Sequence, residues 1–174
     1  EVIWDKQFGF LKETLVAPVP RTVIMLGRTL GGATVATLQG IFVFILTLFV
    51  GFRPEISPLL LLAPFYMLLF AILFTALGTA IASRLNDMQA FPLVMNFLIM
   101  PMFFLSGALF PIDQLPAALK FVVQVNPVSY GVDGMRILLI HLGHFSLWLD
   151  VAVLAVVASL CIAVGAVLFK RIEA

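Results

Sequence analysis

Long apolar stretches, wholly or almost wholly free of charge, dominate this chain. A bilayer core of roughly 30 Å needs about 20 apolar residues of helix to cross it. Four stretches reach that length, and we expect spans at about 29–52, 56–83, 88–110 and 148–169. The pattern therefore predicts an all-α, polytopic integral membrane protein, a helical bundle with four spans.

The connections between the first three predicted spans are short. Residues 51–58 hold Pro54 and Pro58, which favour the end of one helix and the start of the next. Residues 84–87 form a still shorter turn. Short connections keep neighbouring helices antiparallel and adjacent, so spans one to three are expected to pack as hairpins.

The third connection, residues 111–146, is too apolar for an ordinary solvated loop. Segments 117–125 and 129–142 each suit a short helix, with a break at Asn126–Pro127. Neither segment is long enough to span. We favour a re-entrant helix pair that dips into the outer leaflet, and the alternative is an amphipathic pair on the membrane surface.

Small residues recur four apart on one face of each of the first two spans. Such faces let helices approach closely in lipid, so they are predicted to be packing seams. They are Gly32, Ala36 and Gly40 in the first span and Ala71, Thr75, Thr79 and Ser83 in the second. In the third span, Pro92 and Pro101 are expected to kink or unwind the helix.

Composition and charge support a membrane location and suggest an orientation. Residues are 63% hydrophobic and 11% charged, which excludes an ordinary soluble domain. A net charge of +1 says little about partners, and no nucleic-acid partner is expected. If the N-terminal segment and the C-terminus are cytoplasmic, most basic residues lie on the cytoplasmic side of the membrane. That membrane is expected to be a plasma or inner membrane. The inner set is Lys6, Lys12, Arg21, Arg28, Arg84, Lys170 and Arg171, against Arg53, Lys120 and Arg136 outside.

The sequence offers little sign of catalysis. His141 and His144 stand three apart, but no third ligand completes a metal site in that segment. Ser106–Gly107 lacks the preceding glycine of a nucleophile motif, and no phosphate-binding loop occurs. Intramembrane acid and base pairs are absent as well, which weakens a proton-coupled transport mechanism. We therefore expect no enzyme activity and no catalytic, cofactor or metal site in this chain.

The N-terminal segment, residues 5–21, mixes charged and aromatic residues and ends at Pro18 and Pro20. This pattern predicts a short amphipathic helix on the inner membrane face, followed by a rigid elbow. It would serve either as an interfacial anchor or as a docking lever for a soluble partner.

Several motifs together resemble the membrane subunit of a type-2 ABC exporter, closest to the drug-resistance branch typified by daunorubicin exporters. They are Gly9-Phe10-Leu11-Lys12-Glu13, Leu15-Val16-Ala17-Pro18 with Arg21, Leu105-Ser106-Gly107-Ala108-Leu109-Phe110-Pro111-Ile112, Leu115-Pro116 and Asn126-Pro127. Their order and spacing extend over nearly the whole chain.

This resemblance implies six spans in a complete member, of which the spans here are the third to sixth. The chain would then be an N-terminally truncated piece, with a coupling helix and elbow in 1–28 and the transmembrane domain in 29–174. The residues implied to contact the partner in the coupling helix are Phe8, Phe10, Leu11, Lys12, Glu13, Leu15 and Arg21.

The resemblance also implies the partners. A separate nucleotide-binding subunit would bind ATP and Mg²⁺, and a second membrane subunit, identical or different, would complete the pair. Many Phe and few polar residues in the spans favour an apolar or amphipathic cargo, drug-like or lipid-like. The alternatives are glycan export within the same family and a membrane scaffold that transports nothing.

Overall fold

The structure, a computed structural model, describes residues 3–4, 19–85, 87, 89–109 and 116–170. Its elements there are helical and include no strand, so the all-α prediction is confirmed for this part of the chain. The helices are α3 (Arg21–Phe49), η1 (Pro58–Leu62), α4 (Ala63–Arg84), α5 (Ala90–Phe104), α6 (Ala117–Val125), α7 (Pro127–Ile140) and α8 (Leu147–Lys170).

Three helical segments are long and apolar enough to cross a membrane. They are Arg21–Phe49, Pro58–Arg84 and Leu147–Leu168, at the places of the first, second and fourth predicted spans. The first begins earlier than expected, because Pro20 precedes its first turn and no further proline follows until Pro54. The boundary drawn at residue 28, between elbow and membrane domain, therefore falls inside α3.

The third predicted span, 88–110, contains a shorter helix than expected. Helix α5 has 15 residues, which is roughly 22 Å at the usual helical rise. It ends because the backbone turns at Leu105–Gly107, where Gly107 takes a positive φ of 78°. Pro92 lies in the first turn of α5, where it removes no helical bond, so the kink expected there is wrong. Pro101 does lie inside the helix. Whether segment 88–110 forms a fourth span stays a prediction.

Two short helices follow, as predicted. Helix α6 has the expected bounds, and α7 begins at Pro127 and ends at Ile140. The break falls at Asn126, whose backbone is extended because a proline follows it. Whether this pair dips into the membrane stays a prediction.

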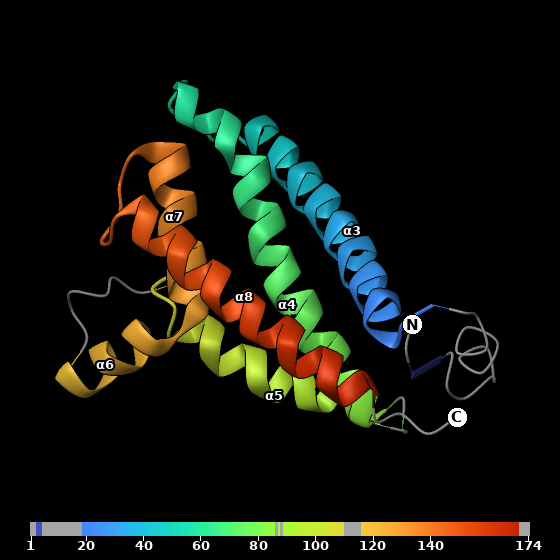
Figure 1. Ribbon diagram of the computed structural model, residues 1–174. Helices are drawn as coiled ribbons and strands as arrows, with labels where there is room; N and C mark the ends of the chain where they lie inside the picture. Colours follow the sequence, from blue (N-terminus) through green and yellow to red (C-terminus); the bar gives the residue numbers. More distant parts are fainter. Residues whose placement is uncertain (1–2, 5–18, 86, 88, 110–115, 171–174) are drawn as a thin grey trace.

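Helix α4 lies at the centre and packs against α3, α8 and α7 (Figure 1). One core joins the start of α3 to the end of α4, with Met25 and Ala76 buried. A second core, at the opposite end of α4, joins it to α7 and α8 through Tyr66, Leu138 and Leu154. The two cores put the starts of α3 and α5 at one end of the bundle and α7 at the other (Figure 1).

Small residues make the helix contacts close, as predicted for α3 and α4. A Cβ on Gly32 would lie 2.7 Å from Cγ2 of Thr75, so these two seams face each other. Glycines of α7 do the same against α4. A Cβ on Gly131 would collide with the Phe70 ring, and one on Gly134 with the Tyr66 phenol.

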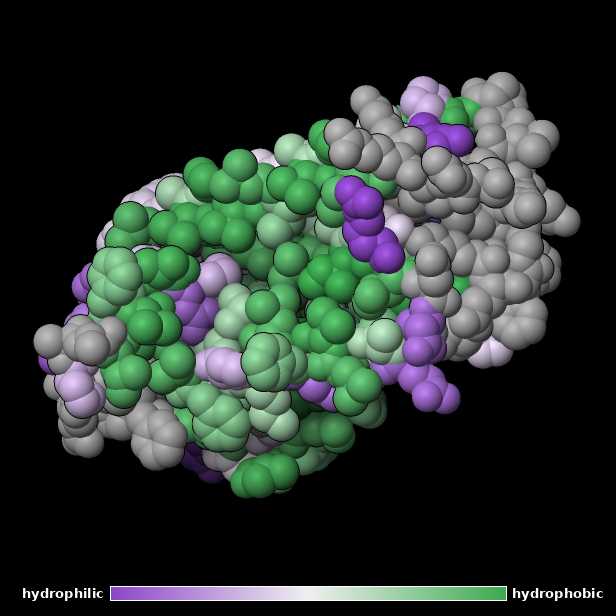
Figure 2. All heavy atoms as spheres, turned by 90° about the horizontal axis from the view of Figure 1, so that it is seen from below, coloured by the Kyte–Doolittle hydropathy of each residue, from purple (hydrophilic) through white to green (hydrophobic). Residues whose placement is uncertain are grey.

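Much of the remaining surface is apolar. Figure 2 shows hydrophobic side chains over most of the visible, non-grey face. Large side chains are nearly fully exposed on several helices, including Phe97 and Trp148, each 84% exposed. Patches of this extent suit contact with lipid or with other membrane helices rather than water.

Substituting Gly134→Ala should destabilise the bundle by about 1–3 kcal/mol, because the added methyl overpacks the buried Tyr66. We expect a lower melting temperature for the protein in detergent. The matched control is Gly31→Ala on α3, where a Cβ meets nothing within 4 Å. That control should keep or slightly raise the melting temperature, and equal losses in both variants would contradict the close approach.

Candidate functional site

Most of the predicted coupling residues lie outside the described residues. These are Phe8, Phe10, Leu11, Lys12, Glu13 and Leu15. Arg21 is described and is the first residue of α3. The coupling set therefore stays a prediction.

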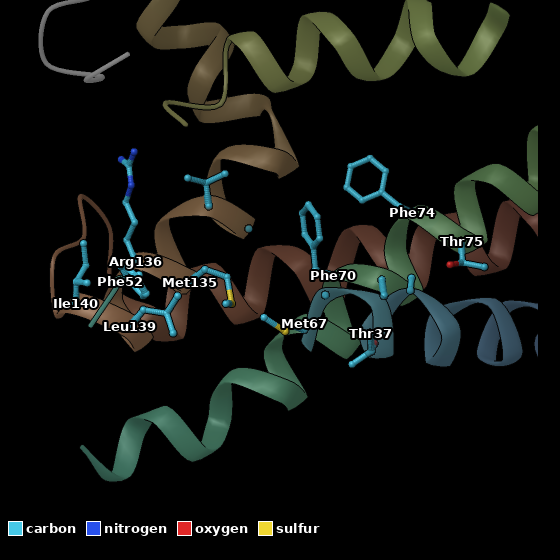
Figure 3. A pocket seen from close by; sticks show the side chains of 15 residues that line it. Thr37, Phe52, Met67, Phe70, Phe74, Thr75, Met135, Arg136, Leu139 and Ile140 are labelled. Carbon is cyan, nitrogen blue, oxygen red and sulfur yellow. The ribbon is translucent and has the colours of Figure 1, made fainter. Parts of the chain in front are cut away.

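A hollow lies between α3, α4 and α7, with Phe52 from the loop after α3 (Figure 3). Its volume is about 710 Å³. It exists because small residues of α3 and α4 stand where bulky ones would fill the space, among them Gly40 and Ala71. Aromatic and thioether side chains form the walls, including Phe70 and Met135. Such walls suit apolar groups of variable shape.

Arg136 is the charged residue among the cavity-lining residues. Its Nη2 donates to the carbonyl oxygens of Gly107 at 2.9 Å and Ala108 at 3.4 Å. The head extends away from Phe70 and Met67 in Figure 3, so the charge stands at the edge of the apolar hollow. An apolar space with a cation at its edge matches the polarity of an amphiphilic ligand. The two hydrogen bonds of Arg136 also tie α7 to the turn after α5.

Asn126 makes a second tie between α5 and the α6–α7 corner. Its Nδ2 donates to the carbonyl of Met102 at 2.6 Å, and its Oδ1 accepts from the amide of Val128 at 3.1 Å. The first bond satisfies a carbonyl at the end of α5, and the second caps α7. The sequence analysis marked Asn126 as a helix break and as part of a family motif, without a hydrogen-bonding role.

The turn between α7 and α8 is organised by an acid that the sequence analysis missed. Asp133 is 3% exposed, and its carboxylate accepts from the amides of His144 at 2.7 Å and Phe145 at 2.8 Å. The sequence signal that could have identified Asp133 was an aspartate inside an otherwise apolar segment. Burial also raises the pKa of the nearby Tyr130 phenol, which therefore stays a neutral hydrogen-bond donor.

The two histidines do not share a metal site in the described structure. Among the described residues, no group of three or more His, Cys, Asp or Glu side chains could hold a metal ion. His141 instead ends α7 with a φ of 54°, and its Nδ1 lies 2.5 Å from the Glu55 carboxylate. This pair links the loop after α3 to the end of α7.

Comparison with known proteins assigns a family. The model of the family described as "ABC-2 type transporter" matches residues 1–140. No solved structure matches the chain.

Three named relatives are similar to this chain. Transport permease ycf38 of Pyropia yezoensis is 33% identical over 79% of this chain and 47% of its own length. Nodulation protein J of Rhizobium meliloti is 30% identical over 69% of this chain and 47% of its own. Inner membrane transport permease YadH of Escherichia coli is 29% identical over 72% and 48%. The chain thus spans about half the length of the curated relatives it matches.

Substituting Asn126→Ala should cost about 1–3 kcal/mol from the unpaired Met102 carbonyl, with about 1 kcal/mol more from the lost cap. We expect a lower melting temperature for the protein in detergent. The control is Gln124→Ala in the preceding turn, where an exposed side chain is removed. A melting temperature equal to that of the control would contradict the role given to Asn126.

Proposed function

The chain belongs to the ABC-2 type transporter family, and from this premise we propose that it forms the membrane path of an ATP-driven exporter. The match to residues 1–140 is the observation that carries this proposal. The three long apolar helices support it, since a transport path needs spanning helices. The chain would have no ATPase activity of its own.

Partners are part of the proposal. A separate nucleotide-binding subunit would bind ATP and Mg²⁺ and hydrolyse the nucleotide. A second membrane subunit would cover some of the apolar surface that the described helices expose, such as that around Phe97. The complex would lie in a plasma or inner membrane, with the N-terminal segment and the C-terminus in the cytoplasm.

The proposed cargo is apolar or amphipathic, either drug-like or lipid-like. The cavity between α3, α4 and α7 supports this, because its walls are apolar and one cation, Arg136, stands at its edge. A glycan would need more hydrogen-bonding groups than Thr37, Thr75 and Arg136 supply.

The proposed lever is the N-terminal segment. Phe8, Phe10, Leu11, Lys12, Glu13, Leu15 and Arg21 would contact the nucleotide-binding subunit. Arg21 opens α3, so a push on this segment would be delivered to a helix that packs along α4 and lines the cavity.

Two variants should uncouple ATP hydrolysis from export without affecting membrane insertion. One is Glu13→Ala, and the other replaces Phe10 and Leu11 together by alanine. The reason is that the lever would lose its contact with the ATPase. We would purify the full-length parent, assay the co-purified ATPase and measure export in vesicles. Gln7→Ala is the control and should behave like the parent.

Two results would contradict this proposal in different ways. Normal coupling in the Glu13 and Phe10/Leu11 variants would remove the lever assignment alone. A parent that brings down no nucleotide-binding subunit would favour the scaffold function, and the family membership would then describe the fold.

Thr37→Phe should lower export of a fluorescent phospholipid analogue several-fold, because the new ring fills the cavity. The control is Thr34→Phe, one turn earlier on α3. Both hydroxyls make the same local bond, Thr34 to the carbonyl of Leu30 and Thr37 to that of Ala33, but only Thr37 lines the cavity. Equal export by the two variants in vesicles would show that the cargo does not use this cavity.

A further inference from the structure

Helix α8 carries a carboxyl group that is completely buried. Asp150 lies in its first turn with 0% of the residue exposed. Neither carboxyl oxygen has a hydrogen-bond partner within the described part of the chain. Further protein around the bundle would leave this side chain buried, since it is already closed off by its own helices.

The titratable groups around Asp150 come from α7 and α4. Asp133 and Tyr130 on α7 and Tyr66 on α4 lie within electrostatic range of it. Residues 29–49 of α3 include no titratable group. In the α7–α8 turn, the His144 ring contacts the ring of Phe145.

The polar neighbours are engaged elsewhere. The Tyr66 hydroxyl donates to the carbonyl of Tyr130 at 2.6 Å, and the Tyr130 hydroxyl donates to that of Gln124 at 2.6 Å. Arg136, the basic residue of α7, is bound to the carbonyls after α5. No cation in the described residues forms an ion pair with Asp150.

The two acids differ in the hydrogen bonds that their carboxyl groups accept. Asp133 accepts two backbone amides, which stabilise a carboxylate. Asp150 accepts none, and a negative charge on it would be repelled by Asp133. The N-terminal end of α8 favours a negative charge, but that stabilisation is smaller than the cost of burying an unpaired carboxylate.

We propose that Asp150 is a proton-binding site, at which a proton neutralises the carboxyl group while α7 and α8 are packed together. The proton comes from water at the α7 end of the bundle and returns to it when that junction opens. Asp133 holds the turn between α7 and α8, so the two acids act on the same junction. This inference does not depend on the proposed export function.

Infrared difference spectroscopy on the full-length parent in lipid nanodiscs tests the proposal directly. At neutral pH, Asp150→Asn should abolish one carbonyl band of a neutral carboxylic acid. Asparagine has the shape of the neutral acid, so the variant should fold. The matched control, Asp87→Asn, removes an exposed acid away from this junction and should keep that band. If Asp150→Asn removed no such band, Asp150 would be ionised and the proposal would be wrong.

Thermal unfolding in detergent gives an independent readout. A group that binds a proton more tightly in the folded state contributes stability that is lost as the pH rises. The parent should therefore lose several degrees of melting temperature between mildly acidic and mildly alkaline pH, and Asp150→Asn should lose clearly less. Equal pH slopes would contradict the proposal. A second result would also contradict it. If replacing choline by sodium at alkaline pH raised the melting temperature of the parent but not that of Asp150→Asn, Asp150 would bind a metal ion instead of a proton.

Discussion

The close approach of α7 to α4 is the contact on which the rest of this structure depends. Gly131 and Gly134 present no side chain to α4, so the rings of Phe70 and Tyr66 lie directly against the α7 backbone. At this distance the Tyr66 hydroxyl reaches the carbonyl of Tyr130. The same approach makes α7 the third wall of the cavity and helps to close the space around Asp150.

Helix ends in an apolar surrounding need partners for their free backbone groups, and side chains supply them here. Asn126 and Arg136 donate to carbonyls at and just after the end of α5, and Asp133 accepts amides in the turn before α8. Each of these side chains comes from α7 or its cap. The short helix α7 thus fixes the end of α5 and the turn that leads into α8. Arg136 also lines the cavity, so this residue serves both the fold and the candidate site.

The sequence pattern predicted what local spacing and apolar length control. It placed three long helices, both short helices and the facing seams of Gly32 and Thr75. It failed where a tertiary contact decides. No local pattern pairs Arg136 with Gly107 or His141 with Glu55, because these residues are distant along the chain. The acids were also missed, since Asp133 and Asp150 lie in apolar segments that were assigned only as helices.

The short α5 is the clearest departure from the expected bundle, and its surroundings explain how a membrane protein accommodates it. A helix of roughly 22 Å leaves part of a 30 Å hydrocarbon core uncrossed. Irregular backbone at such a depth is tolerated only where protein satisfies its polar groups. The turn after α5 meets this condition, because Arg136 donates hydrogen bonds to the carbonyls of Gly107 and Ala108. At the end of α5 itself, Asn126 donates to the carbonyl of Met102. In a bilayer, a crossing at this position would therefore consist of α5 and a turn held by α7, rather than one continuous helix.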